Sequence, residues 1–161
     1  MSVTTDIPAT YRGPRRVFAR LLGAGPREDR LLAMLIAACS LLFVAQMPKL
    51  ARQAHLEGQE LNMLLGGALL GLVFILPLML YAVSWFVHLI ARAAGGQGSS
   101  YRSRLALVWA LLAASPLILL HGLVAGFIGP GPAQDLVGFL WCVVFVWFWV
   151  SGLIQGYWAR A

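Results

Sequence analysis

The sequence predicts an all-α integral membrane protein, a four-helix bundle preceded by a short basic helix at the membrane interface. The chain has 161 residues, of which 60% are hydrophobic and only 11% are charged, and its four long apolar segments are separated by short polar stretches. An ordinary soluble domain is roughly 25% charged, whereas a helix that crosses a bilayer needs ~20 apolar residues. We expect a basic segment over residues 1–25 and one membrane domain over 26–161.

The net charge of +6 does not indicate a nucleic-acid-binding protein. The basic residues gather beside the apolar segments, where they orient helices in the bilayer, so we expect no nucleic-acid partner. Cys39 and Cys142 both lie inside apolar segments, so we expect no disulfide. Lipoprotein cleavage before Cys39 is not expected either, because apolar sequence continues to Met47.

The N-terminal segment is polar at first and then basic. On a helix that begins at Pro14, four apolar residues fall on one side, and Arg16 and Arg20 fall on the other. This pattern is typical of a helix on an anionic membrane surface, and Arg15, Arg16 and Arg20 are its candidate contacts to lipid or to a partner. A disordered basic tail that only fixes the orientation of the spans is an equally good interpretation.

The first span is expected over residues 28–47. Pro26 and the acids that follow favour a helix start, and we expect the helix to stop at Pro48. The second span, 62–92, is roughly 45 Å long at 1.5 Å per residue, more than the ~30 Å hydrocarbon core. It must therefore tilt, kink at Pro77 or project beyond the bilayer.

The third span is expected over residues 105–128, with a kink at Ser115 and Pro116. It ends at a Gly-Pro-Gly-Pro run, through which no helix continues. The fourth span is expected over residues 136–158, with Asp135 as its cap.

A glycine-rich, basic hinge joins the second and third spans. It covers residues 93–104, with the sequence AAGGQGSSYRSR. It lacks the preceding strand and the following Lys-Ser/Thr of a phosphate-binding loop, so we interpret its glycines as turn residues. The candidate contacts to anionic headgroups here are Arg92, Tyr101, Arg102 and Arg104, and a protein docking surface is the alternative.

The distribution of basic residues predicts the orientation. With the N-terminus inside, ten of them lie on the cytoplasmic side and two on the other. The ten are Arg12, Arg15, Arg16, Arg20, Arg27, Arg30, Arg92, Arg102, Arg104 and Arg160, and the two are Lys49 and Arg52. Both termini are therefore expected in the cytoplasm.

Three Gly-xxx-Gly pairs lie within the spans, and such pairs let a second helix approach closely. They are Gly67 with Gly71, Gly122 with Gly126, and Gly152 with Gly156. We expect most of them to pack helices of one chain together. Contact with a second copy or a partner is the alternative, and among 17 glycines some pairs arise by chance.

No set of residues predicts catalysis, a metal site or a cofactor site. The apolar runs of the spans contain no Asp, Glu or Lys, so a catalytic group or a proton pathway is missing. His88 and His121 differ in depth by roughly 18 Å, too far to hold one haem, so each is expected to bond to a neighbouring helix or a water. A metal site built from His55, Glu57, His121 and Asp135 would match no ligand motif.

The residues around the hinge resemble a known family. The pattern is a helix ending in His88-Leu89-Ile90-Ala91-Arg92, then Gly95-Gly96-x-Gly98-Ser99-x-Tyr101, then a helix with Leu105, Trp109 and Pro116. It resembles the bacterial, alphaproteobacterial-like branch of the Yip-domain family, small membrane proteins related to partners of Ypt and Rab GTPases. The resemblance implies a non-enzymatic protein of the bacterial inner membrane and supplies no active-site residues. Members usually have five spans, whereas this sequence predicts four.

These observations predict a membrane-organising or interaction protein. We expect the N-terminal helix and the hinge to contact anionic lipid headgroups and a protein partner or second copy. An accessory subunit of a larger energy-transducing or transport complex is the alternative and would show a fixed stoichiometry with other chains. A small channel or transporter is a third possibility and would show solute flux.

Overall fold

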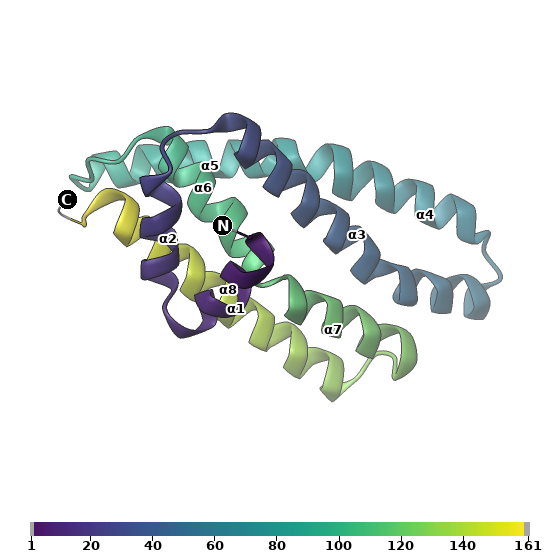
Figure 1. Cartoon of the computed structure of the whole chain (residues 1–161). Coiled ribbons are helices and arrows are strands. Elements are labelled where there is room, and N and C mark those ends of the chain that lie inside the picture. The colour runs from purple at the N-terminus through teal and green to yellow at the C-terminus, as the bar shows by residue number, and fades with distance from the viewer. Residues whose placement is uncertain (1, 160–161) are drawn as a thin grey trace.

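The structure is a computed structural model that describes residues 2–159, and it is all-helical as predicted (Figure 1). In chain order its elements are α1 (Val3–Arg12), α2 (Pro14–Gly23), α3 (Glu28–Glu57), α4 (Leu61–Leu69), the π-helical segment η1 (Leu70–Ile75), α5 (Leu76–Ala93), α6 (Ser100–Ala113), α7 (Ser115–Phe127) and α8 (Pro132–Tyr157). Three helices are long and apolar enough to cross a membrane, and the bent pair α6–α7 makes up to four. Arg160, assigned above to the cytoplasmic side, lies outside the described residues.

Helix α6 is the most deeply buried element. Every residue from Leu105 to Ala114 is buried, because α3, α5 and α8 pack around α6 and α1 covers part of it. The long helices instead expose many large apolar side chains, such as Ile36 on α3, Phe74 and Leu78 on the second long helix, and Phe139 on α8. The chain therefore shields α6 by itself and presents the apolar faces of the other helices to lipid.

The prediction that the first helix ends at Pro48 is wrong. Helix α3 passes through Pro48, continues to Glu57 and ends at Gly58, which has a φ of +65°. Pro48 lies directly against Gly126 of α7, where a Cβ would be 2.8 Å from the Pro48 carbonyl carbon. One turn further on, Arg52 donates a hydrogen bond to the Gly126 carbonyl at 3.3 Å. Packing on α7 therefore stabilises the helix beyond a proline that would end an isolated one.

The second long helix runs without interruption from Leu61 to Ala93. The π-helical segment η1 ends two residues before Pro77, and the Leu76 amide donates to the Gly71 carbonyl, five residues back. A proline has no amide hydrogen and crowds the preceding turn, and a wider turn accommodates it. The helix has 33 residues and spans about 50 Å, so it exceeds the ~30 Å hydrocarbon core, as predicted.

The third span is bent by 46° between α6 and α7. The break lies at Ala114, next to Ser115 and Pro116, which confirms the predicted kink. Pro116 has no N–H to donate to the Leu112 carbonyl, so the α-helical bonding pattern is interrupted there.

The start predicted for the fourth span is wrong. Helix α8 begins at Pro132, its N-cap is Gly131, and Asp135 lies in the first turn rather than at the cap. Proline suits the first helical position because its missing N–H would have no partner there. The Gly-Pro-Gly-Pro run thus separates α7 from α8 and also starts α8.

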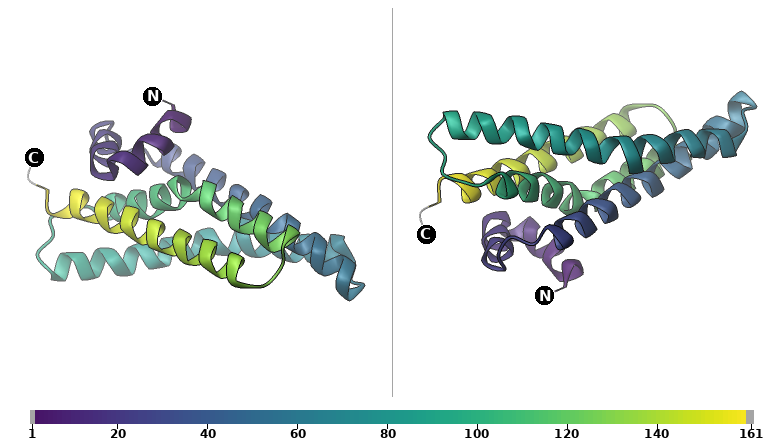
Figure 2. Two further views of the ribbon diagram at one scale, coloured as in Figure 1. Left: turned by 90° about the horizontal axis from the view of Figure 1, so that it is seen from below. Right: turned by 90° about the horizontal axis from the view of Figure 1, so that it is seen from above.

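Two short helices, rather than one helix or a disordered tail, precede the first span. Helix α2 begins at Pro14 as predicted, whereas α1 was not expected from its Thr, Asp and Pro content. The apolar side of α2, formed by Val17, Phe18 and Leu21, is buried in the common core. We call α1 and α2 the N-terminal hairpin, and Figure 2 shows it (purple) standing on one flank of the bundle, near the C-terminus. Its apolar side faces the bundle, so only its outer side is exposed.

Candidate lipid and partner interface

The hinge, the N-terminal hairpin and the end of α8 lie at one end of the molecule, which we call the hinge end (Figures 1 and 2). The turns at residues 58–60 and 128–131 lie at the opposite end. Almost all residues that the sequence singles out for lipid or partner contact fall at the hinge end. Their individual environments differ and decide which of them remain open to a ligand.

The hinge is folded around the side chain of Tyr157. Gly95 has a φ of +83°, which favours glycine, and a Cβ at either Gly96 or Gly98 would lie 2.8 Å from the Tyr157 ring. The Gln97 amide between them donates to the Tyr157 carbonyl at 3.1 Å. The spacing Gly-Gly-x-Gly therefore combines one turn residue with two positions where backbone meets an aromatic ring. Sequence reasoning missed this role of Tyr157, and the glycine spacing is the one signal that indicates it.

The Tyr157 hydroxyl also joins three parts of the hinge end. It donates to the Ser99 carbonyl at 3.1 Å, and its oxygen lies 2.6 Å from Nδ1 of His88 on α5. Because the phenolic hydrogen goes to Ser99, the imidazole must donate from Nδ1. This confirms the prediction that His88 bonds to a neighbouring helix. The other intramembrane histidine, His121, lies against Gly138 of α8, 3.3 Å from the position of a Cβ.

Two arginines of the hinge form hydrogen bonds with groups of the same chain. Arg102 donates to the Gly156 carbonyl at 2.8 Å, near the negative end of the α8 dipole. Arg104 forms two hydrogen bonds with Glu28 at the start of α3, of 2.6 and 3.2 Å, and its guanidinium lies 5.5 Å from the centre of the Tyr81 ring. Both side chains therefore fasten helices together, and their charges are already partly compensated.

Of the remaining arginines that the sequence singles out for lipid or partner contact, one is paired and three are unpaired. Arg20 pairs with Asp6 across the N-terminal hairpin at 3.1 Å, and the Asp6 side chain is only 4% exposed. Arg15, Arg16 and Arg92 are exposed, and within residues 2–159 they form no ion pair and no side-chain hydrogen bond. These three arginines are therefore positive charges of the hinge end that are open to an anion.

Tyr11 fastens the N-terminal hairpin to the bundle. Its hydroxyl donates to the Ala113 carbonyl at 2.8 Å. Its ring packs edge-on against the Phe148 ring, with 4.9 Å between the two ring centres. The Ala113 carbonyl is available because the Leu117 amide donates to Ala114 at the break between α6 and α7. Burial raises the pKa of the Tyr11 phenol, which keeps it a donor at neutral pH. Tyr101, the aromatic contact candidate of the hinge, is half-buried against the core.

The three glycine pairs lie in different surroundings. A Cβ at Gly122 would overlap the Ala45 carbonyl of α3, and Gly126 meets Pro48 on the same helix. Cβ atoms at Gly152 and Gly156 would lie 3.1 Å from Ala106 Cβ and 3.3 Å from Arg102 Cβ of α6. Gly67 and Gly71 have no neighbour within 4 Å of a Cβ. Two pairs therefore pack helices of the same chain, and the third faces outward.

Within residues 2–159, no group of three or more His, Cys, Asp or Glu side chains is arranged to hold a metal ion. Comparison with families of known proteins gives a match to the Yip1 domain over residues 9–157. Comparison with curated proteins and with solved structures gives no match. Yip1-domain proteins are generally non-enzymatic proteins of membrane trafficking. Because the matched region includes the hinge and every candidate span, the chain belongs to the Yip1-domain family of multi-pass membrane proteins.

Proposed function

We propose that this protein organises the bacterial inner membrane or recruits a partner there, without catalysing a reaction. Its hinge end binds anionic lipid headgroups and, beside them, a partner protein or a second copy. The observation that carries the proposal is the exposure of Arg15, Arg16 and Arg92 at one end of the molecule, without an acidic partner in the described part of the chain. An arginine near an anionic membrane surface gains about 1 kcal/mol of attraction.

The proposed orientation places the hinge end in the cytoplasm. The turns at the opposite end are flanked by only two basic residues, Lys49 and Arg52, and Arg52 is already bonded to a carbonyl of α7. Short cytoplasmic segments carry an excess of Lys and Arg, which supports this orientation. In it, the exposed arginines face the leaflet surface that is rich in anionic lipid.

Charge reversal of Arg15 and Arg16 tests the proposal. The full-length protein is reconstituted in bilayers, and the fraction of motionally restricted spin-labelled phosphatidylglycerol is compared with that of phosphatidylcholine. The wild type is expected to prefer phosphatidylglycerol, and R15E/R16E is expected to weaken this preference by roughly 2 kcal/mol or more, because two attractions are lost and two repulsions are gained. Arg20 is left unchanged because it pairs with Asp6.

The matched control is R15K/R16K, which retains both charges and is expected to retain the preference. An unchanged preference in R15E/R16E would remove the basis of the proposal. An equal loss of lipid preference in R15K/R16K and R15E/R16E would also remove that basis.

One observation favours a second candidate, an accessory subunit of a larger membrane complex. The most apolar stretch of the helix Leu61–Ala93 has no buried residue, and Gly66, Gly67 and Gly71 on it are open. Small residues on an exposed helix allow another helix to approach. A fixed stoichiometry with other chains would distinguish this candidate from the first.

A further inference from the structure

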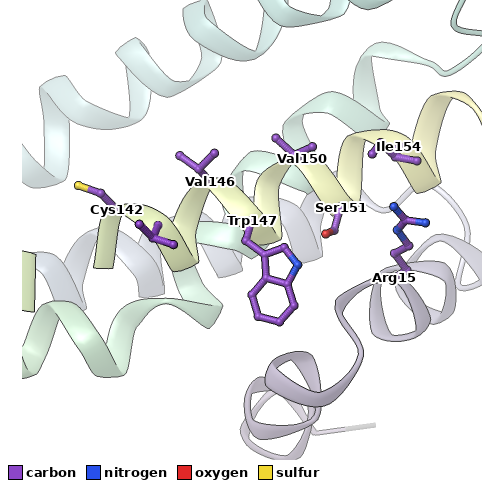
Figure 3. A pocket seen from close by; sticks show the side chains of 8 residues that line it. Arg15, Cys142, Val146, Trp147, Val150, Ser151 and Ile154 are labelled. Atoms are coloured by element: carbon purple, nitrogen blue, oxygen red, sulfur yellow. The ribbon is translucent and has the colours of Figure 1, made fainter. Parts of the chain in front are cut away.

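An open groove of about 590 Å³ runs along α8 and ends at the N-terminal hairpin. The hairpin provides one charged side chain, and α8 provides an almost entirely apolar wall. The residues that line the groove include Arg15, Cys142, Val146, Trp147, Val150 and Ile154. Figure 3 shows Arg15 reaching toward Ile154, with the remaining side chains continuing along α8 as far as Cys142.

We propose that this groove is a binding site for one phospholipid with an anionic headgroup. One acyl chain lies along α8, and the phosphate lies at the guanidinium of Arg15. The inference rests on the proposed function, in which the hinge end binds anionic lipid, and assigns that binding to a defined site. Cavities of about 300–1,000 Å³ with a mostly apolar lining and a few polar groups are typical of small-molecule sites.

The length of the groove fits a single leaflet. From Cys142 to Ile154 the axis of α8 rises by about 18 Å at 1.5 Å per residue. Half of the ~30 Å hydrocarbon core is about 15 Å. A lipid whose phosphate contacts Arg15 would therefore extend its chain toward Cys142, near the bilayer centre.

The charge at the end of the groove favours an anion over a zwitterion. Arg15 is exposed and forms no ion pair within residues 2–159, and no acidic side chain lines the groove. The first turn of α2, which contains Arg15, also has no acidic residue. The positive end of the α2 dipole therefore adds to the charge of the guanidinium instead of being neutralised. Arginine forms paired hydrogen bonds with phosphate oxygens, which suits this headgroup.

The groove differs from an ordinary lipid-facing helix surface because the hairpin closes one end. Val146 and Val150 are about half exposed, as lipid-facing residues are. Next to them, Ser151 also lines the groove and is buried, and α2 packs against α8 where Phe18 lies beside the buried Gly152. An acyl chain in the groove therefore meets a fixed wall with a cation on it. Along α5 the exposed side chains, such as Leu78 and Phe86, are mostly apolar, and Arg92 lies only at the end of the helix.

Photo-crosslinking of the full-length protein in lipid nanodiscs tests the site. The probe is phosphatidylglycerol with a diazirine near the end of one acyl chain, and labelled residues are located by peptide mass spectrometry. We expect labelling concentrated on α8 between Cys142 and Trp147. Arg15→Gln is expected to lower it about fivefold, the factor that corresponds to one arginine at an anionic surface. Arg27→Gln, which removes an exposed arginine outside the groove and outside the proposed lipid contacts, is the matched control and is expected to leave labelling unchanged.

A second variant tests the apolar wall. Val150→Trp fills the groove without changing the charge and is expected to abolish labelling of α8, provided that the variant elutes and melts like the wild type. Three results would overturn the site: labelling of α8 no stronger than labelling of α5, equal losses in R15Q and R27Q, or equal labelling by a phosphatidylcholine probe. If R15E/R16E lowers the lipid preference while α8 is not labelled, the proposed function stands and the groove site fails.

Discussion

Replacement of Gly122 by alanine is expected to destabilise the bundle strongly. In the structure, the added Cβ would overlap the Ala45 carbonyl and lie only 2.7 Å from its carbon atom. Both of these atoms belong to the backbone of α3, so no side-chain rotation relieves the contact. Helices α3 and α7 must therefore move apart along an interface that also includes Gly126 and Pro48.

The magnitude follows from the packing. Insertion of a methyl group into a close-packed interface costs typically ~1–3 kcal/mol. The higher helix propensity of alanine compared with glycine offsets up to about 1 kcal/mol of this cost. We therefore expect Gly122→Ala to lower the free energy of unfolding by about 1–2 kcal/mol. For a chain of this size, that corresponds to a decrease of roughly 2–8 °C in the melting temperature.

Gly67→Ala is the matched control, because it makes the same chemical change in a second Gly-xxx-Gly pair. Nothing lies within 4 Å of a Cβ at Gly67, so this variant is expected to be as stable as the wild type or slightly more stable. The assay is thermal unfolding in mild detergent, followed by tryptophan fluorescence. A Gly122→Ala protein as stable as the wild type would refute the close contact of α3 and α7. A destabilised Gly67→Ala protein would refute the open environment of Gly67.

Three further changes test the hinge end. Gly98→Ala places a Cβ 2.8 Å from the Tyr157 ring, so the hinge should shift and the Gln97 amide should exchange its hydrogen faster. An unchanged exchange rate would contradict the close packing of the hinge on Tyr157. Tyr11→Phe leaves the Ala113 carbonyl without its donor, which should lower the stability of the hairpin contact by ~1–3 kcal/mol. Trypsin should then cleave the N-terminal hairpin faster than in the wild type. Equal cleavage rates would argue that Tyr11 does not hold the hairpin on the bundle. A double-mutant cycle with Arg104→Gln and Glu28→Gln should give a coupling energy below about 1 kcal/mol, because the Glu28 side chain is 55% exposed. A larger coupling energy would contradict this and mean that the ion pair is shielded from water.

The sequence predicts the helices and the sharp bend because both depend on local chemistry. Long apolar runs must form helices in a bilayer, since every backbone group needs a partner inside the same segment. The bend at Pro116 follows from a missing N–H, which no neighbour can replace. The hinge is likewise evident from its glycines. These features hold whatever the helices pack against.

Tertiary contacts decide the features that the sequence does not reveal. Helix α3 continues past Pro48 because α7 packs against it, and hydropathy along one helix contains no information about that neighbour. The three glycine pairs look alike in the sequence, yet only two of them meet another helix. The hydrogen bonds of Arg104 join residues 76 positions apart, so the sequence could present this arginine only as a candidate for lipid contact.

Helix α1 is a further element that its own sequence does not predict, because tertiary contacts stabilise it. Its sequence contains Asp6, Thr10 and Pro8, which favour caps and turns in isolation. In the structure, the Thr10 hydroxyl donates to the Asp6 carbonyl within the helix, and Asp6 pairs with Arg20 of α2. The helix is therefore stabilised by its partner and not by its own propensity.

Native mass spectrometry of the tagged protein, extracted from its own membranes in mild detergent, tests most directly whether the hinge end binds anionic lipid. We predict that the chain, as a monomer or homo-oligomer, retains anionic phospholipid, and that R15E/R16E retains clearly less of it than R15K/R16K. A stoichiometric set of other subunits, with no anionic lipid retained by the wild type, would contradict this prediction and favour the accessory-subunit alternative.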